Sequence, residues 1–285
     1  MNNKPSYFRD HSRHWSEMSY VYPVISRRSG GLSIGINLNL DGVCNFDCVY
    51  CQVLDRKGRA PRPVVVDELL AELEVMLDAV SSGAIWEDER FREVPAERRV
   101  IRDIAFSGDG EPTACRSFAE AVRGVCGLKK RRGLEGVRLI VLTNATLLDR
   151  PAVREGLEAL CEAGGLLWAK LDAGRQVDYE RIDRSAVPLS RVVENIATAP
   201  LPVVIQTMLC RLEGEAMSEA GFTAYMDRVE EIVERHGRVE AIHLYTVARA
   251  TMEAGVEPIS AEALERRAEQ LRASLGERAA VQVFA

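Results

Sequence analysis

The chain has 285 residues, of which 47% are apolar and 28% are charged. This balance provides both a core and a charged surface, which excludes a disordered or collagen-like chain. The net charge of -6 gives no overall field that would draw the protein onto nucleic acid. No apolar run approaches the roughly 18 residues that a membrane span needs. The polar start MNNKPSYFRDHSRHW does not resemble a signal peptide, so we expect a cytoplasmic protein without membrane contact.

Strand-like runs alternate with stretches of helical period along most of the chain. We expect strands over 32–41, 103–107, 137–143, 166–172, 203–209 and 241–247. We expect helices over 66–80, 118–130, 152–163, 189–197, 223–236 and 261–275, and a polar insertion over 81–99. Six strand–helix units in series predict an α/β fold: mainly parallel strands in an open, partial (β/α)6 TIM-type barrel. A flat doubly wound sheet is the alternative.

This pattern also predicts how the chain is divided. We expect an N-terminal extension over 1–31, the barrel over 32–248, and a C-terminal helix and tail packed on the barrel over 249–285.

The first predicted strand, LSIGINLNLD, alternates branched apolar residues with Ser, Gly, Asn and Asp. Helices must cover the apolar face, so the polar face should line the barrel. The same reading places further polar side chains inside it: Ser107, Lys170, Asp172, Gln206, His243 and Tyr245. Buried polar groups need partners, so the interior should hold water or a polar ligand. An amphipathic sheet with one wet face is the alternative.

Three cysteines follow this strand directly: Cys44, Cys48 and Cys51 form a CxxxCxxC loop. The odd total of seven cysteines argues against a disulfide framework and for thiolates that bind metal. Zinc would want a fourth ligand nearby, and none stands within the loop; three thiols suit a 4Fe–4S cluster that leaves one iron open. The other cysteines share no ligand spacing and are expected to be small buried side chains: Cys115, Cys126, Cys161 and Cys210.

The CxxxCxxC loop, with Tyr50 before its last cysteine, resembles the signature of the radical S-adenosylmethionine (radical SAM) superfamily. The resemblance implies that the three thiolates hold three irons and that S-adenosylmethionine chelates the fourth. It also implies that Tyr50 packs near the adenine. Reduction by flavodoxin or ferredoxin would then cleave the cofactor to a 5′-deoxyadenosyl radical, which abstracts hydrogen from a substrate.

A second motif, GDGEPT, follows the second predicted strand and resembles the GGE element of that family, although it is one residue looser. In the family this element grips the methionine ammonium. The resemblance implies a cofactor-binding role for Ser107, Gly108, Gly110 and Glu111. Glycines permit close approach of a ligand, and the carboxylate offers an acceptor for a cation.

Taken together, GINLNLDGVCNFDCVYCQ, FSGDGEPT, LTNATLL, KLDAG and IQTM look like the branch related to the tRNA wyosine-base synthase, over roughly residues 20 to 210. That enzyme carries a second cluster on N-terminal cysteines, whereas residues 1–43 contain none here. The substrate is therefore left open between a tRNA nucleobase and a small metabolite or peptide.

Inward polar residues on later strands are candidates for ribose, methionine carboxylate and substrate: Asn144, Asp172 and Gln206. Lys170 is a catalytic candidate, including as a Schiff-base amine, although a structural ion pair with Asp172 is an equal alternative. His243 and Tyr245 are catalytic candidates as proton donors or radical-quenching groups, and a packed histidine in a hydrogen-bond network is the alternative.

Basic residues gather beyond the cysteine loop, at Arg56, Lys57, Arg59 and Arg62, and again over 129–132. The first group could receive a phosphate or an RNA backbone, although such runs are most often solvated surface. A non-catalytic zinc or iron–sulfur binding module is the remaining alternative function.

Overall fold

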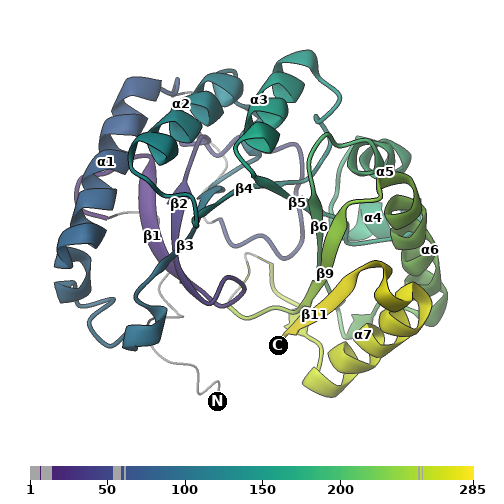
Figure 1. Cartoon of the computed structure of the whole chain (residues 1–285). Helices are drawn as coiled ribbons and strands as arrows, with labels where there is room; N and C mark the ends of the chain where they lie inside the picture. Colours follow the sequence, from purple (N-terminus) through teal and green to yellow (C-terminus); the bar gives the residue numbers. More distant parts are fainter. Residues whose placement is uncertain (1–6, 8–14, 54–58, 61, 250, 252) are drawn as a thin grey trace.

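A curved sheet of eight strands forms the centre of the protein (Figure 1). The computed structural model describes residues 1–285 apart from 1–6, 8–14, 54–58, 61, 250 and 252. In spatial order the strands are β1 (Val21–Ser26), β2 (Gly31–Ile36), β3 (Ile101–Phe106), β4 (Arg138–Thr143), β5 (Leu166–Lys170), β6 (Val203–Met208), β9 (Val239–Tyr245) and β11 (Ala280–Phe284). Only the β1–β2 pair is antiparallel in this sheet, so the predicted partial barrel of mainly parallel strands is confirmed.

Helices cover the outer, convex face of the sheet (Figure 1). They are α1 (Val66–Ser82), α2 (Phe118–Arg131), α3 (Pro151–Glu162), α4 (Gln176–Ile182), α5 (Leu189–Ala197), α6 (Glu219–His236) and α7 (Ala261–Leu275). The side chains of Ser218 and Ser260 cap the starts of α6 and α7 by accepting backbone N–H groups. None of the helices in the described part of the chain has both the length and the hydropathy to cross a bilayer.

The period of two in the strands decides which residues face the helices. Leu32, Ile34 and Ile36 of β2 are fully buried in the main core, which the helices share. The alternate positions face into the barrel, where the side chain of Ser33 hydrogen-bonds to the carboxyl of Asp103. The expected sidedness of the sheet is therefore confirmed.

The expectation of a wholly polar interior is wrong for the deeper part of the barrel. Six inner-face side chains form a separate apolar cluster there: Ala105, Ile140, Leu166, Trp168, Val204 and Ala241. Polar inner-face side chains lie on both sides of this cluster: toward the carboxyl ends of the strands, and at Ser33 and Asp103 toward the amino ends of β2 and β3. The apolar layer supports the sheet from inside, and the indole N–H of Trp168 is the polar group within it.

Both edges of the sheet extend beyond the predicted barrel. Strand β1 comes from the stretch expected to be an extension, and β11 comes from the expected tail. The first predicted strand is also shorter than expected, since β2 ends at Ile36 and residues 37–41 form a loop.

Segments outside the main sheet also depart from the prediction. A small second sheet has the order β10–β7–β8, with β7 (Cys210–Leu212), β8 (Glu215–Ala216) and β10 (Val256–Pro258). The expected polar insertion contains the 3₁₀ helices η2 (Ala84–Glu87) and η3 (Ala96–Arg98), and it buries Ile85, Phe91 and Val94. Two more 3₁₀ helices are η4 (Pro112–Ala114) and η5 (Gly276–Arg278).

Candidate active site

The cysteine loop follows β2 at the carboxyl edge of the parallel strands. Its apolar side chains anchor it, because Phe46, Val49 and Tyr50 are buried. Its backbone is held as well: the N–H groups of Asp47 and Val49 donate to the carbonyls of Asp183 (3.0 Å) and Ile182 (2.9 Å). The three thiols are only half-buried and stand on this fixed backbone: Cys44, Cys48 and Cys51.

The thiols contact other groups of the chain. Cys48 Sγ donates to Asp183 Oδ1 (3.4 Å), and Cys44 Sγ accepts the N–H of Phe46 (3.5 Å). Within the described ranges, no three His, Cys, Asp or Glu side chains are gathered closely enough to hold a metal ion. The donor set fits an iron–sulfur cluster by its chemistry, since it offers three thiols on one loop. The ligand assignment itself stays a prediction.

The GDGEPT turn lies directly against the cysteine loop. The N–H of Glu111 donates to the carbonyl of Val43 (3.1 Å), and a Cβ added at Gly110 would lie 2.0 Å from that carbonyl oxygen. A Cβ added at Gly108 would lie 2.3 Å from Asn37 Oδ1. Both glycines are therefore required by the contact between loops, whatever ligand they also meet.

Glu111 is buried, and both of its carboxylate oxygens are taken by its own chain. Oε1 accepts the backbone N–H of Thr113 (3.1 Å), its hydroxyl (2.5 Å) and the hydroxyl of Thr143 (2.6 Å). Oε2 accepts the N–H of Asn144 (2.7 Å). Burial raises the pKa of Glu111, and these hydrogen bonds oppose that rise. The carboxylate thus links the ends of β3 and β4, in addition to any contact with a cofactor.

Two further predicted ligand-binding residues are also engaged. Asn144 Nδ2 donates to Asn45 Oδ1 (2.7 Å) and lies 4.0 Å from Cys44 Sγ, so it positions the cysteine loop. Ser107 Oγ shares a hydrogen bond of 2.9 Å with the hydroxyl of Tyr22 from β1.

A buried polar network ties the cysteine loop to β5 and β6. Lys170 Nζ donates to the hydroxyl of Tyr50 (2.8 Å), which in turn donates to the carboxylate of Asp172. The other oxygen of Asp172 accepts the N–H of Met208 (2.7 Å). Three of the predicted site residues are therefore in direct contact: Tyr50, Lys170 and Asp172.

The charges of this network fix the protonation of Lys170. Burial by itself lowers the pKa of Lys170, but the neighbouring acidic groups Cys48, Tyr245 and Asp172 outweigh this effect and raise the pKa well above its usual value. Burial, reinforced by Asp172, also raises the pKa of Tyr50. Lys170 is therefore a cation. A raised pKa is the opposite of what the Schiff-base alternative needs, because that alternative requires a free amine.

Gln206 and His243 form a second polar group on the inner faces of β6 and β9, where Gln206 is in register with Lys170. Gln206 Nε2 and His243 Nδ1 are 2.7 Å apart, and the guanidinium of Arg28 donates to Gln206 Oε1. Arg28 comes from the β1–β2 turn and is not among the site residues that the sequence predicts. The only signal for it was a pair of arginines in a turn, a pattern that is usually solvated surface.

Burial lowers the pKa of His243 to about 4, and the charge of Arg28 adds to that effect. The hydroxyl of Tyr245 is neutral, since burial raises its pKa to about 12. His243 is therefore neutral near pH 7 and accepts protons only in acid.

This shift makes stability depend on pH. Between pH 6.5 and about pH 4 the unfolded chain binds a proton at His243 that the folded chain does not, so the free energy of unfolding should fall as the pH falls through this window. The loss attributable to His243 should be at most about 3 kcal/mol. Chemical denaturation across the window measures it. In His243→Asn, which keeps an acceptor for Gln206, the slope should be smaller; an unchanged slope would assign the effect to other groups.

The basic residues near the cysteine loop are largely engaged within the chain. Arg59 pairs with Asp109 (2.7 Å), and Arg62 donates to Ser19 Oγ (3.3 Å). Arg56 and Lys57 lie outside the described residues. Over 129–132, on and just after α2, three basic side chains reach Ala163, Glu74 and Asp78.

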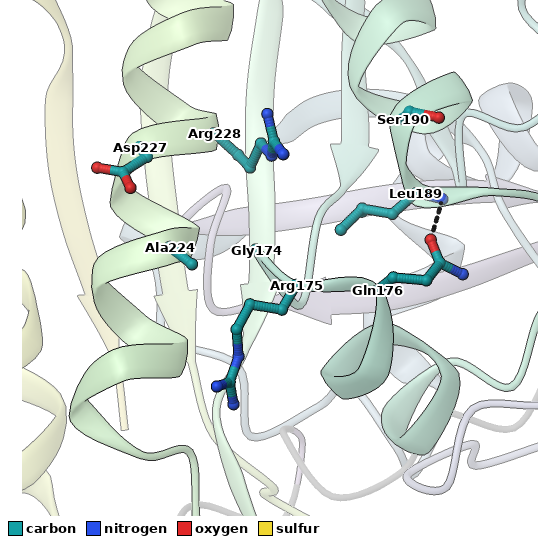
Figure 2. A pocket seen from close by; sticks show the side chains of 8 residues that line it. All are labelled: Gly174, Arg175, Gln176, Leu189, Ser190, Ala224, Asp227 and Arg228. Atoms are coloured by element: carbon teal, nitrogen blue, oxygen red, sulfur yellow. Dashed lines mark hydrogen bonds between the residues drawn. The ribbon is translucent and has the colours of Figure 1, made fainter.

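Two cavities flank this edge of the barrel. One of about 420 Å³ opens between α4, α5 and α6 (Figure 2), and its lining includes Arg175, Gln176 and Arg228. Gln176 Oε1 accepts the N–H of Leu189 there (2.9 Å). The other, of about 240 Å³, is lined in part by Asp172, Met208 and Cys210. The second cavity therefore adjoins the polar network.

Comparison with known proteins identifies the family. The UPF0026 protein slr1464 of Synechocystis sp. is 28% identical over 181 residues, which cover 62% of this chain and 58% of that protein. The chain thus spans little more than half of that relative. The fold is similar to that in the crystal structure of Streptococcus suis SuiB bound to S-adenosylmethionine. The aligned part covers 85% of this chain and 48% of the SuiB chain, with 13% identity and a TM-score of 0.57. The alignment with the crystal structure of archaeal TYW1 covers 85% of this chain and 72% of the TYW1 chain, with 15% identity and a TM-score of 0.49.

The first of these structures shares the fold of this chain. A family model for the radical SAM superfamily matches residues 38–200, a span that contains the cysteine loop and the GDGEPT turn. Because the match covers more than half of the chain, the protein belongs to the radical SAM superfamily, whose cofactors are a 4Fe–4S cluster and S-adenosylmethionine.

Proposed function

We propose that the protein reductively cleaves S-adenosylmethionine and uses the radical to remove hydrogen from a substrate carbon. The observation that carries the proposal is the contact between the cysteine loop and the GDGEPT turn, through Val43, Gly110 and Glu111. When bound, a reduced 4Fe–4S cluster would supply one electron that splits S-adenosylmethionine into methionine and a 5′-deoxyadenosyl radical.

In this proposal Cys44, Cys48 and Cys51 hold the cluster. Residues on the adjoining loops and strands bind S-adenosylmethionine: Tyr50, Ser107, Gly108, Gly110, Glu111, Asn144 and Asp172. Gln206 is less suited to that role, because its side chain is already hydrogen-bonded to Arg28 and His243.

The three catalytic candidates receive different tasks. Lys170 acts as a fixed cation that orients Tyr50 and Asp172. Tyr245, whose neutral hydroxyl belongs to the inner face, is the better candidate for returning hydrogen to a substrate radical. His243 is neutral and holds Gln206 in place.

A small-molecule substrate is favoured over a tRNA nucleobase. The described basic side chains near the cysteine loop, Arg59 and Arg62, already contact Asp109 and Ser19. Binding to tRNA should depend steeply on salt, so a gel shift at low salt with transfer RNA tests this choice. A salt-sensitive complex would reverse it.

Anaerobic reconstitution with iron and sulfide, followed by dithionite and S-adenosylmethionine, tests the reaction. We expect 5′-deoxyadenosine and methionine in equal amounts. A fully loaded cluster that yields neither would contradict the proposal. One tightly bound zinc per chain in place of iron would instead support a non-catalytic binding module.

Turnover also needs a reductant, and we propose flavodoxin or ferredoxin for that task. Either donor should replace dithionite in the same assay. We further propose that the protein works in the cytoplasm, where thiols stay reduced.

A further inference from the structure

A half-buried arginine reaches into the barrel from the amino-terminal side of the strands. Arg28 lies in the turn between β1 and β2, and its guanidinium stands 5.0 Å from the ring centroid of Trp168 and 5.4 Å from that of Tyr245. It also donates to Gln206 Oε1. The side chain therefore contacts β5, β6 and β9, which lie across the barrel from its own turn.

The charge of Arg28 is not neutralised by a direct ion pair. Among the residues that the structure describes, no carboxylate forms a salt bridge with it, and Gln206 is a neutral partner. Burial lowers the pKa of Arg28, and the acidic groups that oppose this are Tyr245 and then Asp103, whose carboxyl accepts the hydroxyl of Ser33. A guanidinium has several N–H donors in a fork that suits carboxylate and phosphate, and one hydrogen bond leaves most of them for another acceptor.

A second donor beside Arg28 has no partner. Trp168 is 6% exposed, and its indole N–H makes no hydrogen bond within the described part of the chain. A buried N–H left without an acceptor costs about 1–3 kcal/mol. Arg28 stands over the face of this same ring, so the guanidinium and the indole with its unpartnered N–H are in contact.

The inner face above these donors is partly open to solvent. Leu142, Lys170 and Tyr245 are half-buried. The residue that precedes each of them on its strand faces the helices and is buried in the main core. Lys170 is one inward position beyond Trp168 on β5, toward the cysteine loop. Lys170 therefore lies between Trp168 and the cysteine loop along β5.

We propose that Arg28 and Trp168 form the anchor for an oxyanion of the substrate, a carboxylate or a phosphate. The inference rests on the proposed function, because it takes the molecule held there to be the one that loses hydrogen. The guanidinium supplies charge and paired N–H donors, and the indole N–H supplies a further hydrogen bond. With the oxyanion anchored there, the rest of the substrate extends toward the cysteine loop.

Anion titration of the reconstituted full chain tests the anchor without any turnover. The probes are sodium malonate and sodium phosphate, with sodium chloride keeping the ionic strength constant. The readouts are the melting temperature by circular dichroism and, in a Trp15→Phe, Trp86→Phe background, the emission of Trp168. We expect a saturable rise in melting temperature and a change in emission. Malonate alone would indicate a carboxylate, and phosphate alone a phosphate ester.

Variants then separate an anchor from a merely structural side chain. Arg28→Gln should weaken the apparent affinity about tenfold or more. Trp168→Phe keeps an aromatic ring beneath the Arg28 cation and removes the indole N–H, so the variant should fold. It should weaken the melting-temperature response less than Arg28→Gln does. The matched control is Arg27→Gln, since Arg27 in the same turn donates to the carbonyl of Ala285 (3.0 Å) and should not affect the response.

Two results would overturn the anchor: no saturable response to either oxyanion, or equal responses in Arg28→Gln and the parent. Either can occur while 5′-deoxyadenosine is still formed, because cleavage of the cofactor needs no substrate anchor. Conversely, a chain that binds malonate through Arg28 but never cleaves S-adenosylmethionine would reject the proposed function alone.

Discussion

Replacing Cys48 with alanine should abolish formation of 5′-deoxyadenosine, with a loss of at least about 100-fold. The proposed cluster has only three protein ligands, so losing one thiolate leaves too few to hold the irons. The iron content and the charge-transfer absorbance of the reconstituted protein should fall together with product formation. Quantification of iron, sulfide and 5′-deoxyadenosine in the same sample measures this.

The alanine also removes the hydrogen bond from Cys48 to Asp183. Cys48→Ser keeps a donor at that place and provides the matched variant: it should preserve the fold and still lose the cluster. Cys161→Ala is the negative control, because Cys161 lies on α3 and its thiol donates to the carbonyl of Pro200 (3.3 Å). A Cys48→Ser protein that retains iron and activity would show that the ligands are misassigned.

The sequence predicted the barrel because most of its strands are two-sided. Leu32, Ile34 and Ile36 alternate with polar positions, and this period survives in the structure as the buried face of β2. The edge strands could not be found in this way. Strand β1 contains Pro23, which sequence reasoning counts against a strand but which an edge tolerates. Strand β11 is short and follows a helix directly, so its sequence predicts a tail and not a strand.

The candidate site was predictable where spacing along the chain encodes it. The cysteine loop and the GDGEPT turn each lie within a few residues, and the carboxyl edge of a parallel sheet brings such loops together. Contacts between distant positions carry no such signal. Arg28 meets Gln206 only because the barrel curves. The partners of Glu111 include Thr143, the last residue of β4, and Asn144, which follows it.

These contacts change what the GDGEPT carboxylate should do when it is removed. The sequence predicts only a cofactor-binding role for Glu111. From that role alone, Glu111→Ala would bind S-adenosylmethionine more weakly and keep an intact fold. In the structure its oxygens accept two backbone N–H groups and two hydroxyls, all buried. Groups left without partners in such a place cost about 1–3 kcal/mol each.

We therefore expect Glu111→Ala to lower the free energy of unfolding by about 3 kcal/mol or more, measured by chemical denaturation of the chain before the cluster is added. Affinity for S-adenosylmethionine should fall as well, because the loops that this carboxylate joins would no longer be held. Asp109→Asn is the matched control: Asp109 lies in the same turn, partly exposed, and the amide keeps an oxygen that can accept Asn37 Nδ2 (3.1 Å). Only the charge pair with Arg59 is lost, so this change should cost less than about 1 kcal/mol. If Glu111→Ala were as stable as the parent and only the affinity for S-adenosylmethionine fell, Glu111 would bind the cofactor without contributing to the stability of the fold. A loss of stability with unchanged cofactor affinity would make it a purely structural link between β3 and β4.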